Sequence, residues 1–223
     1  MIAKIFTEQH GLCSFLIQGA RKKTSPAKAN LLQPLSLVEI VAYHKETSGL
    51  QKVREMKNEY PLQSIQNDIS KTTIALFLSE MLSRSINEET PNKPLFEFLY
   101  KAIIFLDTTG NPVNFHLLFL VKLSKFLGFY PQGIYSDDAL YFNLPDGVFV
   151  NEKPQHPHFI PPELSKTFRQ FLVTDFNEMQ NINLSGHTRK VLLESIIDYY
   201  RLHLTGVKEI KSHQVLETVL GGG

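Results

Sequence analysis

The spacing of apolar residues changes once along this chain of 223 residues, near Tyr60-Pro61, and that change limits what the chain can fold into. Before it, short apolar runs bounded by turns predict β-strands. After it, apolar residues recur every three to four positions, as on one face of a helix. We therefore predict an α+β protein, with a β-domain over residues 1–60 and a helical domain over residues 61–223.

Strands are predicted on either side of turns at Gln9-His10-Gly11 and Thr47-Ser48-Gly49. The fourth predicted strand, which follows the second of these turns, is open to a second interpretation. Its apolar residues Leu50, Val53 and Met56 recur every three residues and fit a helix as well. The predicted strands are Ile2–Thr7, Gly11–Ala20, Leu35–His44 and Leu50–Lys57.

The second part is predicted to be helical with one interruption. Asp68 or Ser70 can cap the first predicted helix. The third predicted helix is apolar nearly all round, which indicates that it is central and buried. The interruption is a hairpin-like insertion near residues 138–150, with its turn at Pro145-Asp146-Gly147. The predicted helices are Ser70–Ile86, Pro94–Leu106, Val113–Leu127, Pro162–Val173, Ser185–Leu204 and Ser212–Leu220.

The net charge of +1 hides an asymmetry between the two parts. Residues 1–60 carry nine Lys or Arg and five Glu, a net charge of +4. Residues 61–223 carry fourteen basic and seventeen acidic side chains, a net charge of −3. The basic character of the N-terminal part indicates a polyanionic partner there.

A cluster of cations follows the predicted end of the second strand at Gly19. Lys and Arg on a loop can neutralise phosphates and release counterions, although a solvated loop has the same composition. The basic residues of the predicted fourth strand either extend this cationic surface or only protect an edge of the sheet from pairing with another chain. The candidate DNA-binding residues are Arg21, Lys22, Lys23, Lys28, Lys52 and Arg54. Base stacking needs aromatic side chains as well; those available are Phe6, Phe15 and Tyr43, for most of which core packing is the expected role.

Residues able to carry covalent chemistry or a metal do not form a recognised set. Cys13 is the one cysteine, which excludes an internal disulfide and a cysteine zinc site, and its apolar neighbours predict a structural thiol. A metal-dependent hydrolase using His156, His158 and Asp137 or Asp138 is an alternative, but two histidines two residues apart need further ligands. We predict no catalytic residue, no metal and no cofactor, and a protein that is not an enzyme.

Two ordered sets of motifs resemble the RecO family of DNA repair proteins. Phe6–Gly11 and Gly19–Lys23 resemble the ends of two RecO strands, written FTxxxG and KGAR in the family. Asn114–Leu118 and Leu127–Pro131 resemble RecO helices in the style of the Bacteroidetes branch. The resemblance covers essentially the whole chain in order.

The resemblance implies an N-terminal OB-fold, a helical C-terminal domain and a recombination mediator in DNA repair. Such a protein binds single- and double-stranded DNA, anneals strands and, with RecR, loads RecA onto strands coated by single-strand-binding protein. The family's basic motif falls on Arg21, Lys22 and Lys23. No apolar run reaches the roughly 20 residues of a membrane span, so we expect a cytoplasmic, nucleoid-associated protein. The alternative is a helical interaction scaffold that does not bind DNA.

Two departures from the family pattern carry expectations of their own. Many RecO proteins hold a four-cysteine zinc site in the helical domain, where this chain has no cysteine. We expect the hairpin region of residues 139–150 to stand in place of that metal module. RecO also begins with a strand before the one on which this chain starts. Because an OB-fold needs five strands to close, we expect an incomplete barrel that lacks its first strand.

Overall fold

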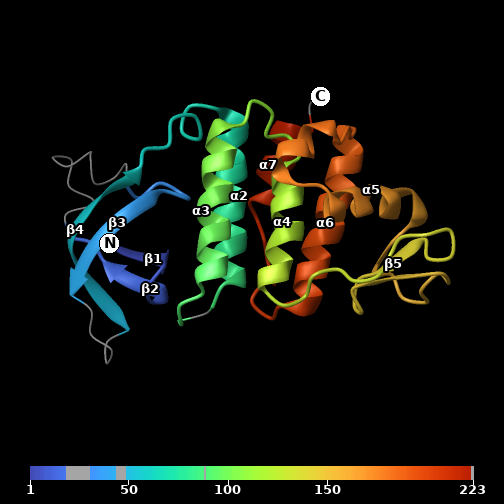
Figure 1. Ribbon diagram of the computed structural model, residues 1–223, viewed down its shortest axis with the longest axis horizontal. Helices are drawn as coiled ribbons and strands as arrows, with labels where there is room; N and C mark the ends of the chain where they lie inside the picture. Colours follow the sequence, from blue (N-terminus) through green and yellow to red (C-terminus); the bar gives the residue numbers. More distant parts are fainter. Residues whose placement is uncertain (19–30, 44–48, 88, 222–223) are drawn as a thin grey trace. The chain divides into compact units, whose positions relative to one another are not determined.

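The computed structural model describes residues 1–18, 31–43, 49–87 and 89–221. The chain divides into two compact units, Met1–Thr108 and Thr109–Gly223 (Figure 1). Over the described ranges, no helix is long and apolar enough to cross a lipid bilayer. The predicted boundary at residue 60 coincides with the end of a strand, whereas the first compact unit extends to Thr108, so the extent of an independently folding domain stays a prediction.

The first unit contains a four-stranded sheet in the order β1-β2-β4-β3. The strands are β1 (Ile2–Thr7), β2 (Gly11–Leu16), β3 (Leu37–Tyr43) and β4 (Leu50–Tyr60). β1 pairs with β2 and β3 with β4 in antiparallel fashion, and β2 pairs with β4 in parallel. The described strands therefore form an open sheet with β1 and β3 at its edges, and among them no closed barrel is present.

β4 is a strand and not the alternative helix, and a β-bulge explains the spacing of Val53 and Met56. Residues 53 and 55 of β4 are each paired with a residue of β3, whereas Arg54 between them has no opposite residue. A bulge adds one residue to one strand and shifts the alternation of its faces. Val53 and Met56 therefore both reach the core, three residues apart, although the segment is extended.

The core of the sheet is small. Phe15 and Ile17 are buried, and packed against them are the partly buried Ala3, Ile5, Cys13, Leu32, Ile40, Ala42, Val53 and Met56. Burial raises the pKa of the Cys13 thiol, which suits the structural role predicted for it.

Two helices complete the first unit, α2 (Ile69–Ser85) and α3 (Lys93–Thr108). Asp68 is the cap of α2, because its side chain accepts a 3.0 Å hydrogen bond from the Lys71 N–H. At the end of α3, the buried Asp107 carboxylate accepts hydrogen bonds of 2.8–2.9 Å from the backbone N–H groups of residues 63–65. The Lys71 ammonium bonds the Asp107 backbone carbonyl at 2.7 Å. These bonds attach the segment after β4 to α3, and α3 to α2.

The second unit is built around a buried helix, as predicted. α4 (Phe115–Phe126) buries every residue from Phe115 to Val121, and it packs against α5 (Pro162–Val173), the 3₁₀ helix η1 (Phe176–Asn181) and α6 (Gly186–His203). The Tyr200 hydroxyl of α6 donates a 2.7 Å hydrogen bond to the Leu120 carbonyl. A short helix, α7 (His213–Leu220), packs on α6.

A small three-stranded sheet interrupts the helices, in the order β6-β5-β7. β5 (Tyr141–Asn143) and β6 (Val148–Val150) are the predicted hairpin; β7 (Phe159–Ile160) adds a third strand too short to predict. Gly147 in the turn has φ 66°, a conformation in which other residues are strained, and a Cβ there would lie 2.7 Å from the Tyr199 hydroxyl. The ring of Phe142 lies 4.9 Å from that of Phe149 and 4.8 Å from that of Phe168, so aromatic packing holds this sheet to α5.

Candidate nucleic-acid interface

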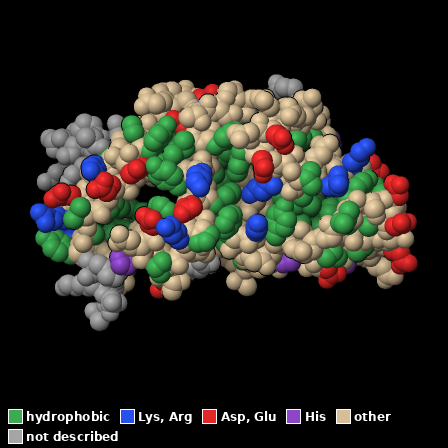
Figure 2. Space-filling model, in the orientation of Figure 1, with side chains coloured by type: hydrophobic (Ala, Val, Ile, Leu, Met, Phe, Trp, Pro, Cys, Tyr) green, Lys and Arg blue, Asp and Glu red, His purple; other side chains and the backbone are tan. Residues whose placement is uncertain are grey.

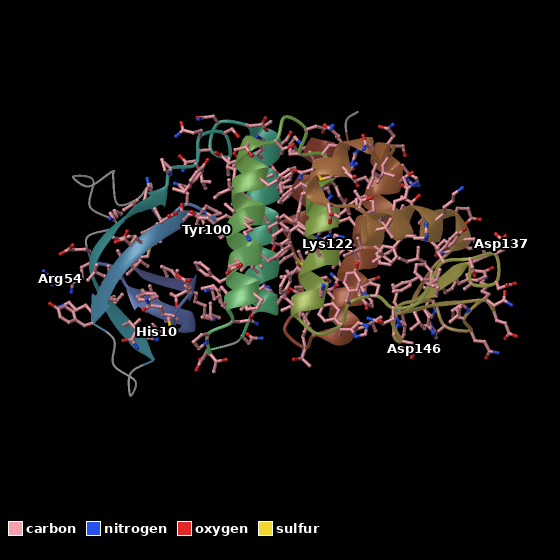
Figure 3. The ribbon with its side chains drawn as sticks, in the orientation of Figure 1. His10, Arg54, Tyr100, Lys122, Asp137 and Asp146 are labelled. Atoms are coloured by element: carbon pink, nitrogen blue, oxygen red, sulfur yellow. The ribbon has the colours of Figure 1, made fainter. Side chains whose placement is uncertain are left out.

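The predicted DNA-binding residues fall into two groups. Arg21, Lys22, Lys23 and Lys28 lie outside the described residues, so their assignment stays a prediction. Lys52 and Arg54 lie on β4, are exposed, and point away from the core that contains Val53. Figure 3 shows Arg54 on the side of the sheet away from α2 and α3.

The cations of β4 differ in their ionic partners. Arg54 lies 3.2 Å from the Glu55 carboxylate, and Lys57 lies 3.0 Å from that of Glu39. Both pairs are exposed, and such pairs contribute only about 0–1 kcal/mol, so a phosphate can replace either carboxylate. Lys52 has no ion pair with any described residue. Figure 2 shows basic and acidic side chains interspersed over this part of the molecule.

A hollow of about 550 Å³ lies beside these charges. It is lined by Gln18, Val41, Arg54 and Lys57, among others. Gln18 is the last residue described before the predicted basic segment at Arg21. The chain therefore leaves β2 for that segment at the rim of the hollow.

A second hollow, of about 540 Å³, lies between the sheet and α3 and has the wrong charge for phosphate. Its phenyl and phenol rings are Phe6 and Phe15 of the sheet and Phe96 and Tyr100 of α3. Its lining includes the carboxylates of Glu8, Glu39, Glu59 and Glu97, against Lys101 and His10. The Tyr100 hydroxyl donates a 2.8 Å hydrogen bond to Glu59, and this bond, more than burial, raises the pKa of Tyr100.

The three aromatic residues considered for base stacking differ in their exposure to solvent. Phe15 is buried in the sheet core, and the Phe6 ring packs 6.4 Å from that of Phe96. Tyr43, by contrast, is exposed on β3. Packing accounts for Phe15 in the sheet core and for Phe6 against α3, and leaves Tyr43 available to a ligand.

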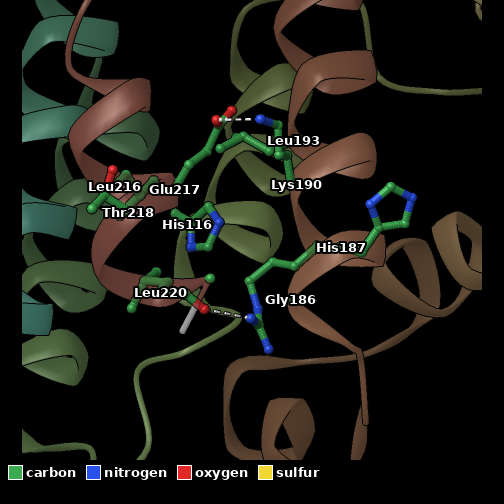
Figure 4. A pocket seen from close by; sticks show the side chains of 11 residues that line it. His116, Gly186, His187, Lys190, Leu193, Leu216, Glu217, Thr218 and Leu220 are labelled. Atoms are coloured by element: carbon green, nitrogen blue, oxygen red, sulfur yellow. Dashed lines mark hydrogen bonds and ion pairs between the residues drawn. The ribbon is translucent and has the colours of Figure 1, made fainter. Parts of the chain in front are cut away.

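The helical unit has a hollow of about 550 Å³ between α6 and α7 (Figure 4). The buried Arg189 guanidinium donates to the Asn114 side-chain oxygen at 3.1 Å and to the Leu220 and Leu184 carbonyls at 2.9 and 3.1 Å. Lys190 pairs with Glu217 at 3.0 Å. These cations tie α6 to α7 and are already engaged. Sequence reasoning missed Arg189, because a single arginine in a helical pattern gives no signal of burial.

Burial in this unit also holds a histidine neutral. Burial, assisted by the charge of Arg189, lowers the pKa of His116 from 6.5 to about 3. Burial likewise lowers the pKa of Arg189. A neutral imidazole beside an engaged guanidinium packs the hollow and does not attract phosphate.

No metal centre is assembled within the part of the chain that the structure describes. No group of three or more His, Cys, Asp or Glu side chains there is placed to hold an ion. The His156 ring nitrogen Nδ1 accepts a 3.2 Å hydrogen bond from the backbone N–H of His158, so these residues order their own loop. The alternative of a metal-dependent hydrolase has no support in this arrangement.

Comparison with known proteins gives a consistent result over nearly the whole chain. The family model described as "Recombination protein O N terminal" matches residues 1–60, and "Recombination protein O C terminal" matches residues 66–213. A protein named "DNA repair protein RecO" from Azobacteroides pseudotrichonymphae genomovar. CFP2 is 34% identical over 98% of this chain and 91% of its own length. Proteins of the same name from Phocaeicola vulgatus and Bacteroides fragilis are 36% and 37% identical, each over 97% of this chain and 90% of its own length.

Proposed function

The chain belongs to the RecO family of DNA repair and recombination proteins, and on that premise we propose that it is a DNA-binding recombination mediator. Membership confirms the predicted family and the prediction of a protein that is not an enzyme. The proposed activity is to bind single- and double-stranded DNA and to promote annealing. The alternative, a helical scaffold that does not bind DNA, is tested by the same experiment.

One observation carries the DNA-binding assignment. The N-terminal family model covers residues 1–60, the part of the chain with a net charge of +4. Its sheet presents Lys52 and Arg54 on an exposed face, next to a hollow at the start of the segment with Arg21, Lys22, Lys23 and Lys28. Cations of this kind neutralise phosphates without reading bases. Annealing requires that combination, because phosphate charge must be screened while the bases stay free to pair.

The proposed partners follow from the family and from the charge distribution. We propose RecR and single-strand-binding protein as protein partners, RecA loading as the outcome, and a cytoplasmic, nucleoid-associated location. We also propose an OB-like role for the N-terminal sheet, supported by its four strands and its small one-sided core. The acidic balance of residues 61–223, a net charge of −3, makes that part an unfavourable surface for DNA.

The test is the salt dependence of DNA binding. Replacing Arg21, Lys22 and Lys23 together by Ala should remove about three phosphate contacts and reduce the slope of log affinity against log salt by roughly 2–3. The matched control replaces three exposed cations of the helical unit by Ala, namely Lys166, Arg169 and Lys208, and should leave the slope unchanged. An unchanged slope in a folded Arg21-Lys22-Lys23 variant contradicts the assignment of this segment. An unmodified protein that binds no DNA at low salt supports the scaffold instead.

A further inference from the structure

The outer face of the N-terminal sheet carries a continuous row of side chains across all four strands. The registers pair Ile2 with Leu16, Leu16 with Lys52, and Lys52 with Tyr43. The neighbouring row pairs Lys4 with Ser14 and Ser14 with Leu50. Since successive residues of a strand point to opposite faces, both rows lie opposite the core formed around Phe15.

This face is open to solvent at its aromatic and cationic positions. Tyr43 is 60% exposed and Ile2 is 61% exposed, at the two ends of one row. Lys4 and Lys52 are exposed as well. A tyrosine ring left largely uncovered beside cations has the chemistry of a single-strand binding surface, in which rings stack on bases and cations follow the backbone.

The spacing of the sheet suits one nucleotide. Lys52 and Tyr43 are directly opposite each other on β4 and β3, where Cβ atoms lie about 4.5–5.5 Å apart. A ring and an ammonium at that distance can reach the base and the phosphate of the same nucleotide. Lys4 lies further across the sheet, two strands from Lys52, which is about 10 Å at the usual strand separation, and can reach a neighbouring phosphate.

We propose that Tyr43, with Lys52 and Lys4, forms a stacking platform for single-stranded DNA on the outer face of this sheet. The inference rests on the proposed DNA-binding function and adds strand preference to it. Bases in a duplex already stack on each other and do not offer a free face, so Tyr43 stabilises single strands selectively. The cations act on both forms, because phosphates are present in both.

The test compares a thymidine oligonucleotide with a duplex of the same length, at several salt concentrations, using the full chain. Tyr43→Ala should weaken single-strand binding by about 5- to 150-fold, the range for loss of one stacked base. Its salt slope and its duplex affinity should stay unchanged. Tyr43→Phe should retain binding, because the ring is kept. Lys52→Ala should weaken both forms and reduce the salt slope by about 1.

The control is Ile69→Ala, which removes another exposed apolar side chain, 69% exposed on α2, and should change neither affinity. Equal weakening of single strand and duplex by Tyr43→Ala, or no weakening at all, overturns the platform. Loss of single-strand binding in Tyr43→Phe overturns it too and covers the case in which the alanine variant does not fold. If the Tyr43 variants contradict the platform while the Arg21-Lys22-Lys23 variant still reduces the salt slope, the proposed DNA-binding function is unaffected. If the unmodified protein shows no salt-dependent DNA binding, both the platform and the proposed function are contradicted.

Discussion

The sheet of residues 2–60 and the helical unit of residues 109–223 bury their side chains very differently. The core cluster of the sheet contains two fully buried side chains, Phe15 and Ile17, surrounded by partly buried ones. In the helical unit, all seven residues from Phe115 to Val121 are at most 3% exposed. The sheet therefore leaves one face to solvent, where a ligand can bind, whereas the helical unit concentrates the burial that stabilises a fold.

The charged groups of the two regions differ in the same way. Arg189 of the helical unit is buried, and its donors satisfy backbone carbonyls and Asn114. Arg54 and Lys57 of the sheet have exposed carboxylate partners that solvent screens. A count of cations along the sequence treats these groups alike. Of these three cations, only Arg54 and Lys57 can exchange their carboxylate partners for phosphate at little cost.

Core truncation should give the largest difference between the two regions. Leu118→Ala in α4 removes a side chain with no exposed surface and should lower the free energy of unfolding by about 2–5 kcal/mol. Ile40→Ala in β3 removes a half-buried side chain and should cost about 1 kcal/mol. Hydrogen exchange of the amides in each element measures the two losses separately. Equal losses would show that the sheet core is as tightly packed as α4.

The loss of folding stability at low pH should also differ between the two units, because each unit buries one titratable group that governs it. The folded pKa of His116, about 3, is below its unfolded value of 6.5. The unfolded chain then binds more protons between these values. The associated stability is present above pH 6.5 and is lost as the pH falls towards 3, by up to about 1.4 kcal/mol per pH unit. Exchange protection of α4 at pH 7 and pH 5 measures this loss, and His116→Leu should reduce it.

The first unit should respond only at lower pH. Burial alone would raise the pKa of Asp107, but the N–H donors of Gln63, Ile65 and Ser64 and the Lys71 ammonium outweigh it and bring the pKa below its ordinary value of 3.8. Stability from this carboxylate is present above about pH 4 and is lost as the pH falls through the lowered pKa. Asp107→Asn should leave the response between pH 7 and 5 unchanged. A steeper loss in α2 and α3 than in α4 over that range would contradict this assignment of the two groups.

Removing one surface carboxylate should change binding more than stability. Glu39→Gln breaks an exposed pair with Lys57 and should change the free energy of unfolding by less than about 1 kcal/mol. It frees Lys57 for phosphate and should steepen the salt slope of DNA binding by up to about 1. Glu97→Gln, which breaks the exposed pair with Lys101 on α3, is the matched control with the same change in net charge. An equal gain in both variants would show an effect of net charge alone.

The smallest expected effect is that of chelation. Because the rings of Phe142, Phe149 and Phe168 hold the small sheet to α5, we expect a metal chelator to leave the unfolding temperature unchanged. Elemental analysis of the purified protein should find well under one zinc ion per chain. A stoichiometric metal, or a lowered unfolding temperature in chelator, would mean that His156 and His158 had been interpreted wrongly.

Most of the secondary structure could be predicted, because it depends on spacing within short segments. The strands β1 to β4, the central helix α4 and the hairpin β5-β6 lie where their local patterns predicted them. β7 and η1 were missed because a strand of two residues and a 3₁₀ helix of six residues are too short to give a period. The candidate site was predictable only as far as charge goes: Lys52 and Arg54 are exposed on one strand, and the basic segment from Arg21 to Lys28 lies outside the described residues.

The amino-acid sequence by itself determined the order of strands and helices, the basic N-terminal part and the ordered motifs of the RecO family. Tertiary structure decided which side chains are covered. Phe6, Phe15 and Tyr43 look alike as aromatic residues in strands, yet only Tyr43 faces solvent. Arg54 marks a bulge, and Arg189 is buried between helices. A local period fixes which residues share a face; which face another element then covers depends on contacts between segments far apart in the chain.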